Sequence, residues 1–155
     1  MKTLATAVAL ALALTVAGGS LAATAKRGTS YRVTMTPRQE VPPPAAPAGA
    51  AGVFTATVAD AGALRSIRWT LTFRNLSGKA VAAHIHAGKR GVAGGVLLAL
   101  CAPCKTGATG RATIARDTAD ALERGTAYVN VHTAKNAAGE IRGQIVKPAA
   151  SVSRY

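Results

Sequence analysis

The chain holds three histidines, and they lie in two short segments in which polar and apolar residues alternate. His84 and His86 belong to the segment 83–88 (AHIHAG), and His132 belongs to the segment 128–133 (YVNVHT). Because successive side chains of a strand point to opposite faces, His84 and His86 share one face. Their imidazoles can bind one metal ion, and a nitrogen from His132 would complete a three-histidine site suited to copper or zinc. The two histidine strands must be neighbours for this site to form.

Other polar residues follow the same alternation. Asn130 shares a face with His132, and Glu140, Arg142 and Gln144 share a face of a later segment. In a metal site, Glu140 or Asn130 would orient a histidine by a hydrogen bond, and Arg142 would guide an anion.

In the structural alternative, which we favour, the histidines hydrogen-bond to Glu140, Asn130 or the backbone and hold a polar sheet face together. Glu140 and Arg142 would then form a pair that fixes the strand register. The sequence contains no nucleophile motif and only six scattered acids, so we predict no catalytic residue.

The two cysteines form a C-x-x-C motif, Cys101 to Cys104. A redox-active motif of this kind normally lies at a helix N-terminus, where the thiol pKa is lowered. Here the segment 105–107 (KTG) follows, and no helical pattern appears. We therefore predict a structural disulfide that fixes a loop, with redox catalysis and metal binding by the thiolates as alternatives.

Alternating apolar residues predict several short strands. They fall at about 31–35, 54–58, 67–74, 81–87, 96–100, 113–114, 127–133 and 140–147. One short helix is expected near 118–124, capped by Asp117 and ended by Gly125. The pattern predicts an all-β fold, a single Greek-key-like antiparallel β-sandwich or barrel with one short helix.

The first residues have the features of a secretory signal peptide. Lys2 precedes an apolar run, Leu4 to Ala17, and the segment 23–25 (ATA) fits a cleavage site. We expect a signal peptide at 1–25 and a mature protein at 26–155, with cleavage after Ala22 as the alternative. The run is too short to span a membrane, and no second candidate follows, so no transmembrane anchor is expected. The protein would be exported and periplasmic, cell-envelope-associated or secreted, where a disulfide is permitted.

The chain is strongly basic, with 19 lysines and arginines against 6 acids. Such a charge attracts anionic cell-envelope polymers, lipid headgroups or nucleic acid. The arginines form no run, and few aromatic residues interleave with them, so the sequence does not favour nucleic acid as a partner. Two interpretations of the positive charge remain. It gives the protein a solvated basic surface, or it attaches the protein to an anionic cell envelope.

Four segments together resemble the CHRD family, the domain named from chordin: 39–43 (QEVPP), 83–88, 128–133 and 139–144 (GEIRGQ). The resemblance covers about 31–147. It implies a secreted or surface β-sandwich, since in chordin such domains occur in an extracellular antagonist of growth factors. On this basis we expect a non-enzymatic binding or structural module with an unidentified extracytoplasmic ligand or protein partner.

A weaker resemblance is to Cu/Zn superoxide dismutase, where an H-x-H strand also precedes a V-x-H strand and a functional arginine. It implies copper binding by His84, His86 and His132, with Arg142 attracting the substrate anion. The chain has no further histidine, so the bridging ligand and the zinc loop are missing and only a copper site could remain. A copper-binding, dismutase-like protein is therefore the alternative function.

Overall fold

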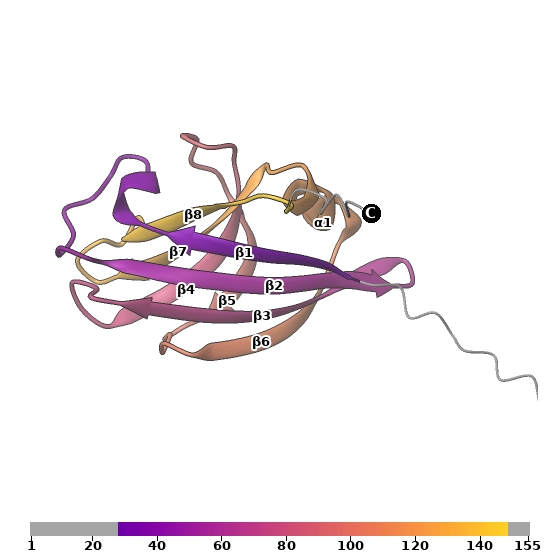
Figure 1. Cartoon of the computed structure of the whole chain (residues 1–155), viewed down its shortest axis with the longest axis horizontal. Helices are drawn as coiled ribbons and strands as arrows, with labels where there is room; N and C mark the ends of the chain where they lie inside the picture. Colours follow the sequence, from indigo (N-terminus) through magenta and orange to yellow (C-terminus); the bar gives the residue numbers. More distant parts are fainter. Residues whose placement is uncertain (1–27, 149–155) are drawn as a thin grey trace, which may run out of the picture.

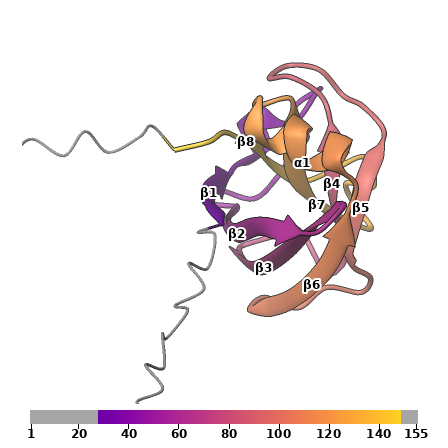
Figure 2. The ribbon, with the colours of Figure 1, turned by 90° about the vertical axis from the view of Figure 1, so that its right-hand side faces the viewer.

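The computed structural model describes residues 28–148, which form two facing antiparallel sheets (Figures 1 and 2). The strand order of the first sheet is β1 (Thr29–Met35), β2 (Ala51–Ala61), β3 (Leu64–Arg74) and β6 (Ala108–Ile114). The order of the second is β5 (Val96–Cys101), β4 (Ala80–Ala87), β7 (Ala127–Thr133) and β8 (Ile141–Ile145). The sandwich prediction is confirmed. The sheets approach each other at β1 and β8, through one bridge between Thr36 and Arg142, but they do not close into a barrel.

The core lies between the sheets and is built by the predicted alternation. In β3, Ile67 and Leu71 are fully buried and Trp69 is nearly so. Ile85 of β4 and Val129 of β7 face them from the second sheet, also without exposure. The inward faces of both sheets are therefore apolar, and burial of such side chains typically contributes about 1.5–3 kcal/mol each.

The one α-helix among the described residues, α1 (Arg116–Glu123), begins slightly before the predicted start and lies at one end of the sandwich (Figure 1). The prediction that Asp117 caps it was wrong. The N-cap is Ala115, which makes no side-chain hydrogen bond, and Asp117 lies in the first turn. There its negative charge still favours the positive end of the helix dipole. Gly125 follows the helix with φ +69°, as a helix-ending glycine should.

Of the eight strands in the described residues, only β7 has the predicted bounds; β2, for example, runs over Ala51–Ala61 rather than 54–58. β6 has seven residues rather than two, because the glycine in its middle hides the alternation in the sequence. β8 ends at Ile145, two residues before the predicted end. Within residues 28–148 no helix is long and apolar enough to cross a membrane. The predicted signal peptide lies outside the described residues.

The glycine in the middle of β6, Gly110, gives room for the core tryptophan. A Cβ added to Gly110 would lie 2.6 Å from Cε2 of Trp69. We expect Gly110→Ala to reduce the free energy of unfolding by about 1–3 kcal/mol, since the indole must shift within a packed core. Gly78→Ala is the matched control, because nothing lies within 4 Å of its added Cβ. Equal denaturant midpoints for the two variants would contradict this packing argument.

The outer face of the second sheet is covered rather than exposed. Every residue of β7 and β8 is buried, although only one face of these strands meets the core. Two loops cover the other face: residues 36–50, which include the short 3₁₀ helix η1 (Pro37–Gln39), and residues 88–95. Antiparallel sheets commonly leave one face to water. Here that face holds the polar residues singled out in the sequence.

Candidate metal centre

The two histidine strands are neighbours in the second sheet. β4 pairs with β7 antiparallel, so that His84 lies opposite Asn130 and His86 opposite Tyr128. His132 lies two residues beyond Asn130 on β7, opposite Ala82. One ring nitrogen from each of the three histidines lies within 4.8 Å of the other two. A three-histidine cluster required the two histidine strands to be neighbours, and they are.

Backbone carbonyls fix the orientation of two of the rings. Nδ1 of His86 lies 2.9 Å from the carbonyl oxygen of Gly94, and Nδ1 of His132 lies 2.9 Å from that of Ala137. A carbonyl oxygen only accepts, so each Nδ1 carries the hydrogen and donates it. In the neutral ring, Nε2 then keeps a free lone pair, which is the tautomer that a metal ligand needs.

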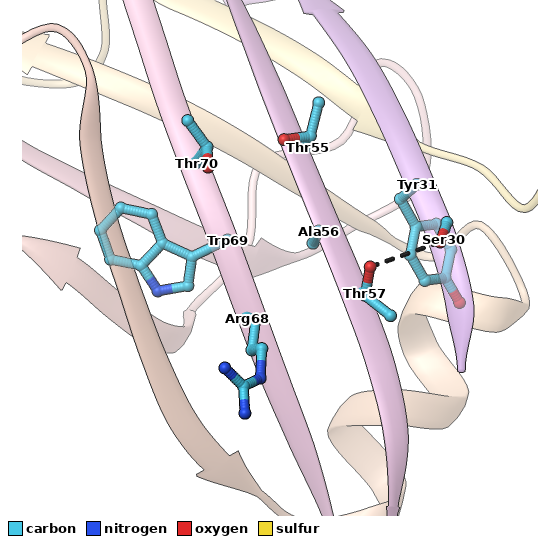
Figure 3. A pocket seen from close by; sticks show the side chains of 8 residues that line it. All are labelled: Ser30, Tyr31, Thr55, Ala56, Thr57, Arg68, Trp69 and Thr70. Carbon is cyan, nitrogen blue, oxygen red and sulfur yellow. Dashed lines mark hydrogen bonds between the residues drawn. The ribbon is translucent and has the colours of Figure 1, made fainter. Parts of the chain in front are cut away.

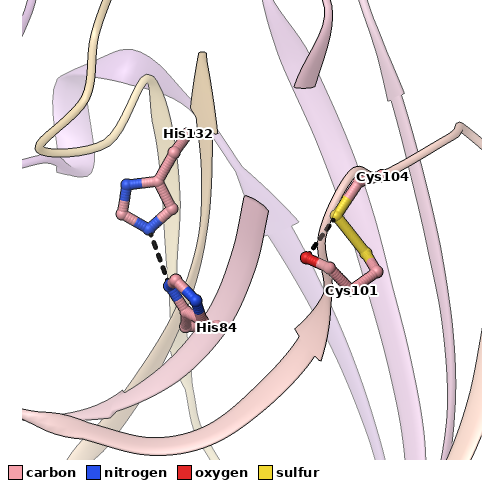
Figure 4. The surroundings of a disulfide bond; sticks show 4 residues. All are labelled: His84, Cys101, Cys104 and His132. Carbon is pink, nitrogen blue, oxygen red and sulfur yellow. Dashed lines mark hydrogen bonds between the residues drawn. A yellow bond between two sulfur atoms is a disulfide. The ribbon is translucent and has the colours of Figure 1, made fainter. Parts of the chain in front are cut away.

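The two Nε2 atoms have different surroundings. Nε2 of His86 is buried and has no hydrogen-bond partner. Nε2 of His132 lies 3.0 Å from Nδ1 of His84 and, having no hydrogen of its own, accepts from it (Figure 4). Nδ1 of His84 and Nε2 of His132 therefore face each other, and Nε2 of His86 is the buried ring nitrogen that lacks a partner.

Burial and mutual repulsion favour the uncharged imidazoles. Burial lowers the pKa of His84, and the neighbouring His132 and His86 lower it further. Burial also lowers the pKa of His132, against the hydrogen bond to Ala137, which raises it. Neutral imidazole is the form that binds metal.

The cluster is wider than a loaded metal site. Bonds of about 2.0–2.1 Å place two nitrogens on one ion about 3.3–3.6 Å apart. The nitrogens of the cluster lie within 4.8 Å of one another, so the rings need to approach by no more than about 1 Å to bind one ion. Side-chain rotation of His84, the least buried of the three, supplies such a movement.

Tyr128 connects the cluster to Arg142. The rings of His86 and Tyr128 stack, with centroids 5.0 Å apart and planes 7° apart. The guanidinium of Arg142 also packs on the ring of Tyr128, with its Cζ 3.4 Å from the ring centroid. Arg142 donates from Nη2 to the carbonyl oxygens of Lys89 and Val92, at 3.0 and 2.9 Å. It is 1 % exposed, so it holds the 88–95 loop and does not present its charge to solvent.

The same loop is held at both of its ends. Gln144 donates from Nε2 to the carbonyl oxygen of Gly88, 2.9 Å away, and to two further carbonyls. At the other end, the backbone N–H of Gly94 donates to the hydroxyl of Tyr128, 3.3 Å away. Because the carbonyl of Gly94 also orients His86, the position of this loop sets the geometry of the cluster.

Glu140 is fully buried and is bound by groups other than histidine. Its carboxylate accepts from the backbone N–H and the hydroxyl of Ser77, at 2.6 and 2.5 Å. It also accepts from the hydroxyl of Thr133 at 2.6 Å and from the amide of Asn136 at 3.0 Å. Among the described residues, neither a histidine nor Arg142 forms a hydrogen bond or an ion pair with this carboxylate. Glu140 thus joins the β3–β4 connection to the β7–β8 turn.

Glu40 is a buried acid for which the sequence predicted no role. It is 6 % exposed and lies beside the Asn130 amide, with Gly139 against it. A Cβ on Gly139 would lie 2.7 Å from Cδ of Glu40, so this approach requires glycine. Burial raises the pKa of Glu40 to about 7, although Arg142 and the Asn130 amide act to lower it. In the sequence, Glu40 is marked only by its place in the segment 39–43 of the family resemblance.

The predicted cysteine pair forms a disulfide at the end of β5 (Figure 4). Cys104 is buried, and its backbone N–H donates to the carbonyl oxygen of Ala80 at 3.1 Å. The disulfide therefore fixes the loop after β5 against the start of β4, the strand that carries His84.

Fold and site together define a two-sheet β-sandwich domain whose second sheet carries a polar cluster, with three histidines, beneath two loops. The family model of the CHRD domain matches residues 31–145. The chain belongs to the CHRD domain family. A search of the curated proteins and a search of the solved structures give no match.

Proposed function

We propose that this CHRD-domain protein is an extracytoplasmic binding module that holds one copper ion through His84, His86 and His132. One observation carries the proposal: two backbone carbonyls take the Nδ1 hydrogens of His86 and His132, and this leaves Nε2 of each ring without a hydrogen, as a metal ligand requires. One ring nitrogen of each of the three histidines lies within 4.8 Å of the other two. Among divalent first-row metals, sites rich in imidazole bind copper most tightly.

Copper binding does not by itself make an enzyme. The dismutase analogy needs Arg142 to attract an anion, and its guanidinium is instead buried against Tyr128 and two carbonyls. We therefore propose binding without turnover. Export rests on the sequence of residues 1–25, and the disulfide between Cys101 and Cys104 supports an oxidising compartment.

A second candidate is a purely structural role for the polar face. The hydrogen bonds of Glu140, Gln144 and Arg142 run within the domain and fix its loops. The hydrogen bond between His84 and His132 fits this role as well. In that case the histidines would stabilise the sheet and bind no metal.

Copper titration separates the two candidates. We expect wild type to bind one copper ion per chain, with nitrogen hyperfine structure in the electron paramagnetic resonance spectrum. His86→Gln should weaken binding by at least about 100-fold, more than the loss of a residue that only supports a ligand. Lys135→Gln, an exposed change in the β7–β8 turn, is the control and should bind as wild type does. Binding no tighter than background, or equal binding by His86→Gln, would refute the copper proposal.

A further inference from the structure

The outward face of the first sheet is a second feature with binding chemistry, well away from the histidines. We call it the arginine face. Its members are the outward residues of β1, β2, β3 and β6: Ser30, Arg32, Thr34, Val53, Thr55, Thr57, Ser66, Arg68, Thr70, Thr72, Arg74, Thr109, Arg111 and Thr113. The sequence shows only scattered arginines. The sheet brings four of them onto one surface, together with seven threonines and two serines.

The charge of this face is of one sign. Arg32, Arg68, Arg74 and Arg111 are all exposed, and within residues 28–148 none of them forms an ion pair or a side-chain hydrogen bond. None of the six acids of the chain lies at an outward position of this face. They are Glu40, Asp60, Asp117, Asp120, Glu123 and Glu140.

Two of the arginines lie directly opposite each other. Arg68 of β3 pairs in register with Arg111 of β6. Like charges in this position destabilise a sheet unless an anion lies between them. Arg74 is six residues further along β3, so the arginines extend for about 20 Å along one strand.

Hydroxyl groups and shallow hollows fill the space between the arginines. An open depression of about 400 Å³ is lined by Ser30, Thr55, Thr57, Arg68 and Thr70, among others (Figure 3). A second, of about 290 Å³, adjoins it and shares Arg68 and Trp69. The surface thus offers charged donors and hydroxyls over a broad, open area.

We propose that the arginine face binds an anionic polysaccharide. Guanidinium groups bind carboxylates and sulfates through paired hydrogen bonds, and the threonine hydroxyls can bond to sugar hydroxyls. A polymer with a charge on each repeat can contact arginines spread over such a length. Leu64, at the start of β3, is a large exposed hydrophobic residue at an outward position, but one such side chain is too little to anchor the face in a lipid layer. No exposed aromatic ring lies at the outward positions of these strands to stack on a base. The proposal is independent of copper binding.

Binding to immobilised alginate, with neutral dextran as the reference, tests the proposal. The full mature protein is compared with the variant Arg32→Gln, Arg68→Gln, Arg74→Gln, Arg111→Gln. The control variant removes the same charge elsewhere, as Arg38→Gln, Lys79→Gln, Lys135→Gln, Lys147→Gln; all four residues are exposed. We expect the first variant to bind at least tenfold more weakly and the control to stay within about threefold of wild type. Wild-type retention should fall steeply with salt.

Three results would overturn the proposal. Equal losses in both variants would mean attraction to net charge alone, and no loss in either would mean binding elsewhere. Binding of wild type to vesicles of anionic phospholipid or to single-stranded DNA, but not to alginate, would assign the face to another partner. Thermal unfolding of each variant checks that it is folded. His86→Gln should bind alginate as wild type does, whatever its affinity for copper, because the two proposed sites are independent.

Discussion

Replacing Glu140 by alanine should reduce the free energy of unfolding by at least about 3 kcal/mol. The carboxylate is fully buried and satisfies four donors, two from Ser77 and one each from Thr133 and Asn136. A buried donor left without a partner costs about 1–3 kcal/mol. The hydroxyls of Ser77 and Thr133 already lie 3.1 Å apart and can partly compensate each other, so the loss stays below the sum of all four.

Urea unfolding of Glu140→Ala beside Glu123→Ala measures this effect. Glu123 is an exposed acid on α1, and its replacement should change stability by no more than about 0.5 kcal/mol. If the two variants have the same midpoint, the carboxylate does not hold the two connections together.

The same carboxylate predicts a pH dependence. Burial raises the pKa of Glu140, but the hydrogen bonds from Ser77, Thr133 and Asn136 outweigh burial and hold it below its ordinary value. A lowered folded-state pKa stabilises the fold above the unfolded value of about 4.3, and this contribution is lost as the pH falls through the folded-state pKa. Glu140→Gln should therefore lose less stability than wild type between pH 5 and the acid transition.

Replacing Arg142 by alanine should remove about 3–5 kcal/mol of stability and release the 88–95 loop. The side chain is 1 % exposed, packs on Tyr128 and supplies the donors for the carbonyls of Lys89 and Val92. Losing a buried charged group in this way leaves its partners unpaired and opens a cavity. Because Tyr128 stacks on His86, the loss should also increase the freedom of that ring.

Hydrogen exchange locates the second part of this effect. The N–H of Gly94, bonded to the Tyr128 hydroxyl, should exchange faster in Arg142→Ala under conditions where both proteins stay folded. The N–H of Phe73 in β3 of the first sheet is bonded to the hydroxyl of Thr106 in the β5–β6 connection, and it should exchange as in wild type. Arg111→Ala, an exposed change, is the matched variant. Unchanged exchange at Gly94 would show that the loop is held without Arg142.

The sequence predicted which polar residues share a strand face, because the alternation is strict in the segments around His84 and His132. It did not predict the partners of Glu140. That residue lies just before β8 begins, where the chain turns, so the partners come from the β3–β4 connection, far away in the sequence. Glu40 was missed for a related reason: a proline-rich loop has no periodicity that shows it folding back over a sheet.

The arginine face could not be predicted from the sequence, because its arginines lie far apart along the chain. Arg32, Arg68 and Arg111 are separated by dozens of residues, and only the order β1-β2-β3-β6 brings them together. Strand positions were largely predictable from local pattern, but strand order depends on contacts between distant segments. A charge pattern on a sheet is therefore visible only after the order is known.

The complete burial of β7 and β8 has a consequence for how this domain can change over time. Strands with one wet face can replace half of their residues at little cost, but these two have no such positions. Most substitutions that survive should therefore accumulate on β1, β2, β3 and β6, whose outward halves face solvent. Two relatives of this chain could then keep nearly the same second sheet and carry quite different outer surfaces.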